Sequence, residues 1–469
     1  MENKRAFQIL IVLLVAGLAL RVYPPLSYDF LVNFDSIYHA RIGQIVADTG
    51  WVPMWDPAAG GRPHLYPPLY HLTIGWTSTV TGISAFELVQ YVLPFLSALL
   101  VFPTFFLIRR YRDEHAALFG AALMAFCPIV ISQSYDSPQV FGLLLFPLLV
   151  YSFLKGNYPI GGGILALCVL SNYGIVLIAG TVMAAFAIMK YLKGEKKFLV
   201  YGGLIFAIGL GLASPWLFIS ASRAGECFEP STIVSAVNEP GMSYLLVIAP
   251  FVAGIGLYVL YLTKPGGRLS SKDDDYCLFW RLALGIGIAG FLASLVMPQL
   301  HPYDQLLLGG FSLPFLFADA RKDKAFVRTM LIVFIIGSVF SVIAIKPALS
   351  SDDLAAVAWV TQNVHEGRIL ADIEISGAIN MYTGSKGIQT SFDQFLECLP
   401  DRQRWVDLQR ALATKDPAEA RSILDEYAIN YIVVGARDEL HYGFDIRKFG
   451  SMGLEVVFMS GESIVYEII

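Results

Sequence analysis

The stretch that decides the fold is NFDSIYHARIGQIVADTGWVPMWDPAAGGRPHLYPPLYHL, residues 33–72. It follows AFQILIVLLVAGLALRVYPPL (6–26), a run apolar enough to form a membrane helix. Ionisable side chains gather in it, directly after the apolar run: Asp35, His39, Arg41, Asp56, Arg62, His64 and His71. Because ionisable groups are unfavourable near hydrocarbon, those kept there usually have a function. We therefore expect the chemistry of the protein to start here.

The composition is that of a polytopic membrane protein. Of 469 residues, 56% are hydrophobic and 15% are charged, and the mean hydropathy is +0.60, which is far more apolar than a typical soluble domain. The net charge is -5, and no Lys/Arg-rich run offers the field that a phosphate backbone needs, which argues against nucleic acid as a partner. Since MENKR precedes the first apolar run and no small-residue cleavage site follows it, we expect a retained signal-anchor.

About eleven segments are long and apolar enough to cross roughly 30 Å of hydrocarbon. We place these predicted spans near residues 6–24, 87–108, 115–133, 138–154, 159–172, 174–192, 198–219, 243–263, 278–297, 303–319 and 326–346. Residues 66–82, YPPLYHLTIGWTSTVTG, are also apolar but rich in Thr, Ser and aromatic residues, which is typical of a helix lying in the membrane interface.

The distribution of basic residues predicts the orientation. If residues 66–82 do not cross and the N-terminus is cytoplasmic, every Lys/Arg cluster between predicted spans faces the cytoplasm, as the positive-inside rule requires. Only Arg21, Arg41, Arg62 and Arg223 then remain in the opposite short loops. A crossing at 66–82 would instead place every later Lys/Arg cluster on the extracytoplasmic side. We therefore predict a multi-pass protein whose C-terminal segment is extracytoplasmic.

The character of the chain changes near residue 350. An amphipathic helical pattern is followed by a short strand, RILADI (368–373), and β-branched runs NYIVVGA, LEVVFMS and ESIVYEII come after a helical DPAEARSILDEYA. The predicted fold is thus mainly α: a helical membrane bundle over residues 1–348, with a first external loop at 25–86, and a small soluble α/β domain over 349–469. Its length is usual for one domain.

Asp35 is the first candidate for catalysis. It opens a predicted helix in which Ile37, Ile42 and Val46 share an apolar face, and His39 follows it by one turn. One interpretation is that Asp35 only caps the helix, since Asp is a favoured cap residue. Its position just outside a membrane helix favours a functional role instead.

Asp136, in SQSYDSPQVFG (132–142), is the second candidate, on the same predicted side. It and Pro138 are also suited simply to start the next helix. However, two carboxylates together with substrate phosphates are a typical Mg²⁺ arrangement, so Asp35 and Asp136 are candidate ligands for a divalent cation, Mg²⁺ or Mn²⁺. The metal and the capping interpretations both stay open.

Two later external segments carry further candidates for binding a donor phosphate or an acceptor. Glu239 lies in GECFEPSTIVSAVNEPGMS (225–243), which is equally well explained as a solvated loop. His301 and Asp304 lie in MPQLHPYDQLLLGG (297–310), where an interfacial His beside Tyr303 is as easily structural.

The motif FDSIYHARIGQIVADTG, followed by WDP and YPPLYHL, resembles the first external loop of the GT-C superfamily of polyprenyl-phosphate-dependent glycosyltransferases. Among these it is most similar to the catalytic subunit of oligosaccharyltransferase. CPIVISQSYDSPQVFGLLLF resembles the second external loop of that family, and TIVSAVNEP is a fainter match to its mobile loop. VAWVTQNVHEGRILADIEISGAINMYTG resembles the start of its outer soluble domain.

The resemblance implies an inverting glycosyltransferase in which Asp35 acts on the acceptor or binds metal and Asp136 is a metal ligand. Three departures matter. Pro138 stands where the family has another acidic residue, ILADIEISG stands where the family has a Trp pair that reads the acceptor peptide, and LHPYDQ replaces an expected arginine. These departures favour a simpler relative that moves one sugar from a polyprenyl monophosphate.

The residues themselves are suited to that reaction. His39, Arg41, Arg62, His64 and His301 are candidates to hold the donor phosphate by charge-assisted hydrogen bonds, and Asp35 to take the proton of the acceptor hydroxyl. The acceptor would be a glycan, a lipid or a protein. The alternatives are an oligosaccharyltransferase that glycosylates proteins, a transporter or flippase of lipid-linked sugars, and a catalytically inactive relative. Against transport, no predicted span carries a charge near the membrane centre.

Overall fold

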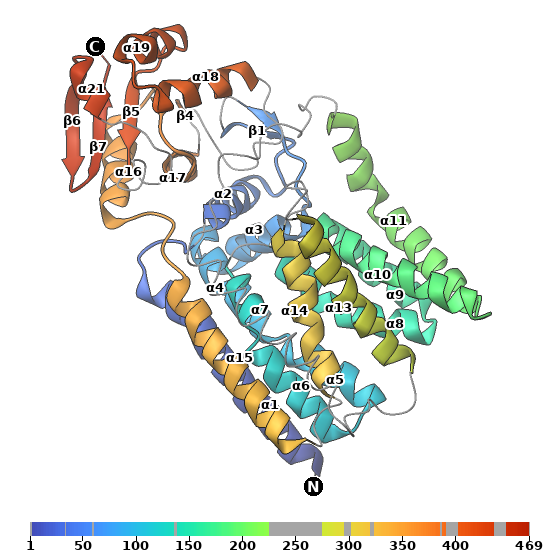
Figure 1. Cartoon of the computed structure of the whole chain (residues 1–469). Helices are drawn as coiled ribbons and strands as arrows, with labels where there is room; N and C mark the ends of the chain where they lie inside the picture. Colours follow the sequence, from blue (N-terminus) through green and yellow to red (C-terminus); the bar gives the residue numbers. More distant parts are fainter. Residues whose placement is uncertain are drawn as a thin grey trace.

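A computed structural model gives the arrangement drawn in Figure 1, a helical bundle with a small mixed sheet beyond one end of it. The described residues are 2–32, 34–58, 61–135, 138–224, 274–294, 302–318, 323–384, 387–390, 402–435 and 447–468. Asp136, Glu239 and His301 lie outside these ranges. Asp304 lies within helix α14 (Pro302–Phe317), but its side chain is not described.

The bundle accounts for most of the described chain. Besides α14, its helices are α1 (Glu2–Ser27), α4 (Ala85–Ala98), α5 (Val101–Tyr111), α6 (Glu114–Ala125), α7 (Pro128–Ser132), α8 (Gln139–Lys155), α9 (Tyr158–Ser171), α10 (Tyr173–Leu192), α11 (Lys197–Ala224), α13 (Asp275–Ser294) and α15 (Lys324–Ala344). Within the described ranges, six helical runs are long and apolar enough to cross a membrane, and three apolar helices are shorter. The protein is therefore a mainly helical, multi-pass membrane protein. The predicted number of about eleven spans is not confirmed, and the predicted span at 243–263 lies outside the described residues.

One predicted span is broken. Residues 115–133 form α6 and then the short α7, which begins at Pro128 after an extended Cys127. Proline has no N–H for the helix ladder and disfavours a helical residue before it, so the break has a local cause. The carbonyl groups of Ala125 and Phe126 are released by the break, and both accept side-chain hydrogen bonds, from Arg21 and from Ser338.

Arg21 corrects the predicted first loop. The predicted first span ends near residue 24, but α1 continues to Ser27 and contains Pro24 and Pro25. Arg21 therefore lies inside a membrane-spanning helix and is fully buried. The expectation that Arg21 belongs to an external loop is wrong.

The segment after α1 forms two helices joined by a small hairpin. Helix α2 (Phe34–Thr49) packs along α3 (Leu69–Thr81), and strands β1 (Trp55–Asp56) and β2 (Arg62–Pro63) pair antiparallel between them. Helix α3 ends at Gly82, which has a left-handed backbone (φ 72°). At about 1.5 Å per residue, its 13 residues are too few to cross the bilayer, which agrees with the expectation that residues 66–82 do not span.

The C-terminal part contains a five-stranded sheet in the order β4-β3-β5-β7-β6. Strands β4 (Ile388–Thr390), β3 (Gly367–Leu370) and β5 (Tyr431–Val434) run parallel, whereas β7 (Ser463–Glu467) and β6 (Glu455–Ser460) complete the sheet as antiparallel strands. The accompanying helices are α16 (Ser351–Asn363), α17 (Ile373–Thr383), α18 (Arg402–Ala413), α19 (Pro417–Glu426) and α21 (Arg447–Ser451). The predicted strands at RILADI, NYIVVGA, LEVVFMS and ESIVYEII are thus all present.

The sheet is not simply tethered to the bundle. One buried apolar cluster joins Ile37 and Ile74 of α2 and α3 to Val357, Ile379 and Val465 of the C-terminal part. Figure 1 shows α2 between the bundle and the sheet, with α17 beside it. Helix α2 is therefore held from both sides, so the position of its first turn is well defined.

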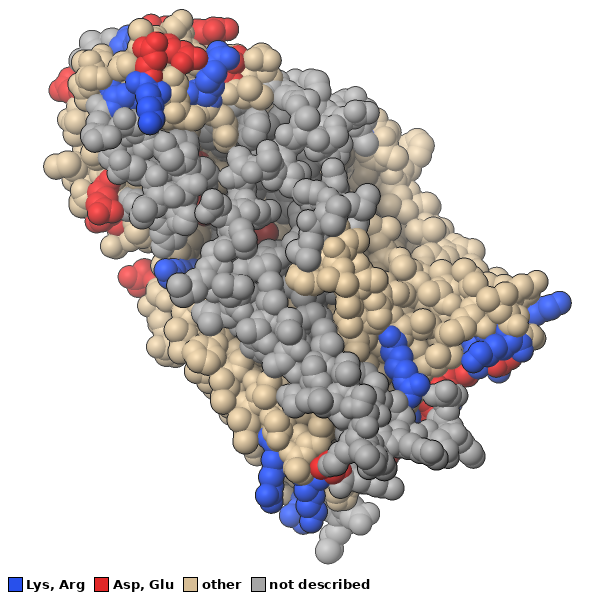
Figure 2. All heavy atoms as spheres, in the orientation of Figure 1, with Lys and Arg blue, Asp and Glu red and all other residues tan. Residues whose placement is uncertain are grey.

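Charges are segregated along the bundle. Figure 2 shows Lys and Arg side chains gathered at the bundle end that lies away from the sheet, and a second group on the C-terminal part. The flanks between are mostly uncharged on the face shown. This is the pattern expected of helices whose middle sections contact lipid.

Candidate functional site

Asp35 lies in the first turn of α2, where the sequence predicted it, and its side chain is half-buried. Ile37, Ile42 and Val46 do not share one face, because nine residues make two and a half helical turns. All three are fully buried since α2 packs against α3, α4 and α17. It ends at Gly50, whose N–H donates to the carbonyl of Val46 at 2.7 Å and whose φ is 85°. A carboxylate in this position benefits from the positive end of the helix dipole.

The first turn of α2 contacts the segment that carries the second predicted acid. The hydroxyl of Ser36 donates to the carbonyl of Tyr135 at 2.5 Å, across 99 residues of sequence. The phenol of Tyr135 in turn donates to the carbonyl of Arg21 at 2.6 Å. The structure thus brings together the segments 34–36 and 133–135, as the pairing of Asp35 with Asp136 requires, although Asp136 itself lies outside the described residues.

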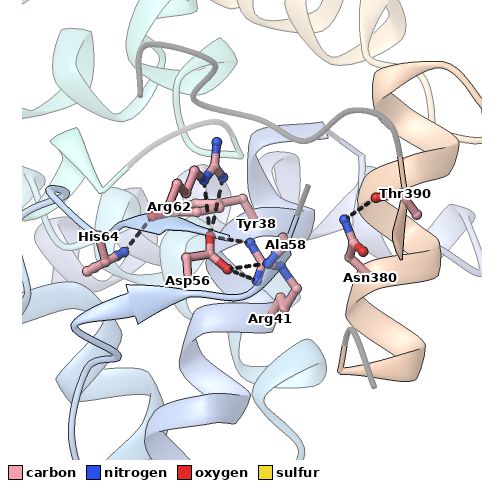
Figure 3. Close-up of polar contacts among 8 residues, drawn as sticks. All are labelled: Tyr38, Arg41, Asp56, Ala58, Arg62, His64, Asn380 and Thr390. Carbon is pink, nitrogen blue, oxygen red and sulfur yellow. Dashed lines mark hydrogen bonds and ion pairs between the residues drawn. The ribbon is translucent and has the colours of Figure 1, made fainter. Parts of the chain in front are cut away.

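Asp56 is the centre of a buried ionic cluster (Figure 3). Arg41 donates to both of its carboxylate oxygens, at 2.5 and 2.8 Å, and Arg62 lies 3.3 Å from Oδ2. The backbone N–H of Ala58 also donates to Asp56, at 3.1 Å. The ring of Tyr38 lies beneath both guanidinium groups, 5.6 and 5.8 Å from their central carbons.

Burial alone would raise the pKa of Asp56, but attraction and hydrogen bonding by Arg41, together with Arg62 and the Ala58 N–H, hold this pKa well below its ordinary range. The carboxylate is therefore ionised. In this cluster one carboxylate holds two guanidinium groups between α2 and the β1–β2 hairpin.

Three histidines lie next to this cluster. His39 Nδ1 is 2.8 Å from His71 Nε2, and His64 Nδ1 is 2.9 Å from the hydroxyl of Tyr38. Burial lowers the pKa of His39 to about 3 and that of His64 to about 4, and it lowers the pKa of His71 well below its ordinary value. All three imidazoles are consequently neutral at physiological pH, and they contribute hydrogen bonds rather than charge.

Comparison with known proteins identifies the fold. Residues 9–222, which include α2, the hairpin and α3, match the family model described as "Oligosaccharyl transferase STT3, N-terminal". The oligosaccharyltransferase AglB from Archaeoglobus fulgidus, solved with an inhibitory peptide and a dolichol-phosphate, superposes with a TM-score of 0.60 at 13% identity, covering 93% of this chain and 70% of AglB. The chain has the STT3/AglB-like GT-C glycosyltransferase fold.

Two other solved structures share the GT-C fold. The arabinofuranosyltransferase AftD from Mycobacteria matches with a TM-score of 0.59 at 14% identity, over 98% of this chain and 40% of AftD. ArnT from Cupriavidus metallidurans, bound to undecaprenyl phosphate, matches with a TM-score of 0.52 at 13% identity, over 97% of both chains. No curated protein matches the sequence.

Within the GT-C fold, the predicted phosphate-binding residues hold one another. Arg41 and Arg62 contact Asp56, His64 contacts Tyr38, and His39 contacts His71 rather than an open surface. All four are buried. Their role in binding a donor stays a prediction, whereas the contacts in the structure join α2 to the β1–β2 hairpin and to α3.

No metal site is present among the described residues, because no group of three His, Cys, Asp or Glu is arranged to hold a cation there. Asp35 is the single predicted ligand whose placement is described, so a cation shared with Asp136 stays a prediction. The same holds for binding by Glu239, His301 and Asp304.

Asp56 is the residue whose role the sequence alone did not indicate. The motif WDP, Asp56 included, was matched to the family pattern, but nothing in the spacing showed that Arg41 and Arg62 converge on Asp56. The C-terminal part also approaches this region, because α17 packs against α2. Figure 3 shows Asn380 of α17, which donates to the hydroxyl of Thr390 at 2.7 Å.

Proposed function

We propose that this chain is a membrane glycosyltransferase that transfers a sugar from a polyprenyl-phosphate-linked donor, of the dolichyl type, to an acceptor on the extracytoplasmic face. The observation that carries the proposal is the position of Asp35. It is a half-buried carboxylate in the first turn of α2, joined to the second external segment through the 2.5 Å bond from Ser36 to Tyr135.

Further support comes from the relatives. Among the solved GT-C structures, AglB was solved with a dolichol-phosphate and ArnT with undecaprenyl phosphate. A sugar carried on such a lipid stays at the membrane surface, so donor and acceptor must meet there. The basic end of the bundle in Figure 2 is opposite the sheet, which supports a cytoplasmic N-terminus and an extracytoplasmic C-terminal part.

The proposed reaction is a single displacement. The acceptor hydroxyl oxygen attacks C1 of the sugar while the bond from C1 to the phosphate oxygen breaks, through an oxocarbenium-like transition state. Asp35 takes the hydroxyl proton, and the guanidinium groups of Arg41 and Arg62 stabilise the departing phosphate. A divalent cation at Asp35, if bound, would neutralise the same developing charge.

The test uses the full-length protein in lipid nanodiscs with a set of polyprenyl-phosphate hexoses and pentoses, and measures release of polyprenyl phosphate and labelled glycan. Asp35→Asn should abolish transfer without altering expression or folding. Asp48→Asn is the matched control, because Asp48 lies exposed at the other end of α2 and bonds only Gln44 among the contacts described for it. Full activity of Asp35→Asn would refute the assignment.

Protein N-glycosylation is the second candidate, favoured by the match of residues 9–222 to the STT3 model. A peptide carrying an Asn-X-Ser/Thr sequon, offered with a lipid-linked oligosaccharide, separates the two functions. We expect no glycopeptide, because ILADIEISG, which forms the end of β3 and the start of α17, has no Trp pair. Mass spectrometry of glycans and glycolipids from cells with and without the protein would then identify the acceptor.

A further inference from the structure

Arg21 is a fully buried cation in the middle of a hydrogen-bond network. Its Nε donates to Ser97 Oγ of α4 at 2.9 Å, and its Nη1 donates to the carbonyl groups of Gly17 and Ala125 at 2.9 and 2.8 Å. No carboxylate pairs with it among the described residues, and its Nη2 has no hydrogen-bond partner there. Because a buried charge without a counter-ion is unfavourable, packing alone does not explain why an arginine occupies position 21.

The network is built around the break between α6 and α7. Ala125 is the last residue of α6, so its carbonyl lacks a helical partner and lies at the negative end of the helix dipole. Gly17 allows the approach, since a Cβ at this position would lie 3.2 Å from Arg21 Nη1 and 3.3 Å from the Ala125 carbonyl oxygen. Arg21 therefore closes the broken end of α6.

The same network reaches the first turn of α2. The hydroxyl oxygens of Ser97 and Ser134 are 2.6 Å apart, which ties the Arg21 side chain to the segment just before Tyr135. The Tyr135 phenol donates to the backbone carbonyl of Arg21, and the Tyr135 carbonyl accepts from Ser36. Two routes thus lead from Arg21 to the residue that holds Ser36, the neighbour of Asp35.

We propose that Arg21 is a positioning residue for Asp35. By closing α6 and holding Ser134 and Tyr135, it fixes the backbone against which Ser36 is placed. What Asp35 does chemically rests on the proposed function, whereas its positioning by Arg21 does not.

The deciding experiment is hydrogen–deuterium exchange of the full-length protein in phosphatidylcholine nanodiscs, with wild type compared to Arg21→Met. Exchange should rise about tenfold in peptides covering 34–38 and 129–135, because both segments lose the network that the Arg21 side chain holds together. Exchange in the C-terminal sheet should stay unchanged. Ser338→Ala is the matched control. Ser338 Oγ donates to the Phe126 carbonyl at 2.7 Å, so its loss also removes a side-chain donor from the α6–α7 break, but it has no contact with Tyr135 among those described.

Unchanged exchange at 34–38 in Arg21→Met would overturn the proposal, and so would a rise spread evenly over the bundle or an equal rise at 34–38 in Ser338→Ala. If Arg21→Met does not fold, Tyr135→Phe gives the answer, because it removes the bond to the Arg21 carbonyl and leaves the guanidinium in place. Exchange at 34–38 should then still rise, and its absence would refute the inference.

A kinetic measurement separates positioning from a general loss of structure. With dolichyl phosphate mannose as donor, Arg21→Met should lower kcat about ten- to a hundredfold at unchanged KM, because misplacement of a reacting group affects the transition state more than binding. Arg21→Lys, which keeps the charge, should restore part of kcat. A rise in KM with kcat intact would count against positioning. If the wild type turns over no donor, the proposed function fails, while the exchange experiment still decides the role of Arg21.

Discussion

The hydroxyl of Ser36 donates to the carbonyl of Tyr135 at 2.5 Å, and this bond joins two segments that are 99 residues apart. Asp35 precedes Ser36, and the predicted metal ligand Asp136 follows Tyr135. The contact therefore joins the start of α2 to the described segment that precedes Asp136. It depends on the end of α1 at Ser27 and the start of α2 at Phe34, and on the break between α6 and α7, which lies about 90 residues further along the chain.

The first prediction concerns the ionic cluster. Asp56→Asn should lower the free energy of unfolding by about 3–5 kcal/mol, because it removes a buried carboxylate that both Arg41 and Arg62 contact. SDS titration in mixed micelles measures this change. Glu114→Gln is the control, since Glu114 pairs with the 40% exposed Arg109, and it should cost at most about 1 kcal/mol. Equal losses in the two variants would contradict the central role of Asp56.

The second prediction concerns pH. His39, His64 and His71 have a lowered pKa in the folded protein, so the unfolded chain binds more protons than the folded one between the ordinary pKa and the folded pKa. Stability should therefore fall as the pH drops from about 6.5 toward 4, by up to roughly 1.4 kcal/mol per pH unit for each histidine. Asp56 affects stability in a separate pH range, because its pKa is lowered in the folded protein and the free energy of unfolding falls on its account only below about pH 4.

Thermal unfolding between pH 4 and 7 measures this slope. His64→Gln should flatten it by removing one of the three titrations, and the exposed His365→Gln serves as the control variant. A slope that is the same in wild type and His64→Gln would show that the buried imidazoles do not titrate as their surroundings require.

Periodicity and composition predicted the large features of this fold. The apolar residues Ile37, Ile42 and Val46 that follow Asp35 located α2, and β-branched runs located β3, β5, β6 and β7. These features depend on residues close in sequence. The break at Pro128 also had a local signal, since a proline inside an apolar run interrupts the helix ladder.

The side-chain partners could not be predicted in the same way. Arg41, Asp56 and Arg62 were all visible in the sequence, but their convergence depends on a hairpin of two two-residue strands whose register only the structure gives. Arg21 was counted with the external loops because it lies near the end of the predicted span at 6–24, whereas α1 continues to Ser27. Both the ionic cluster and the position of Arg21 depend on tertiary packing, which residues close in sequence do not determine.

The third prediction tests the interfacial placement of α3. Trp76 is 49% exposed, and its ring lies 6.3 Å from that of Trp51, as expected of an aromatic pair at the membrane surface. In nanodiscs containing lipids brominated near the headgroup, Trp76→Phe should reduce the quenching of tryptophan fluorescence. Trp280→Phe should not, because Trp280 is fully buried and stacks on Phe315 at 3.8 Å. Quenching that is insensitive to Trp76 would place α3 away from the lipid.

The fourth prediction concerns the close contact between α2 and α3. A Cβ at Gly75 would lie 2.4 Å from Val46 Cβ and 2.8 Å from the carbonyl oxygen of Gly43, a backbone atom that cannot move aside. Gly75→Ala should therefore push the helices apart and lower the free energy of unfolding by about 1–3 kcal/mol. Because α2 carries Asp35, we also expect kcat to fall more than the loss of folded protein explains.

Gly163→Ala in α9 is the control, since nothing lies within 4 Å of its Cβ position, and it should be neutral or stabilising by up to about 1 kcal/mol. If Gly75→Ala kept full stability and full kcat, the packing of α3 would not be what holds Asp35 in place.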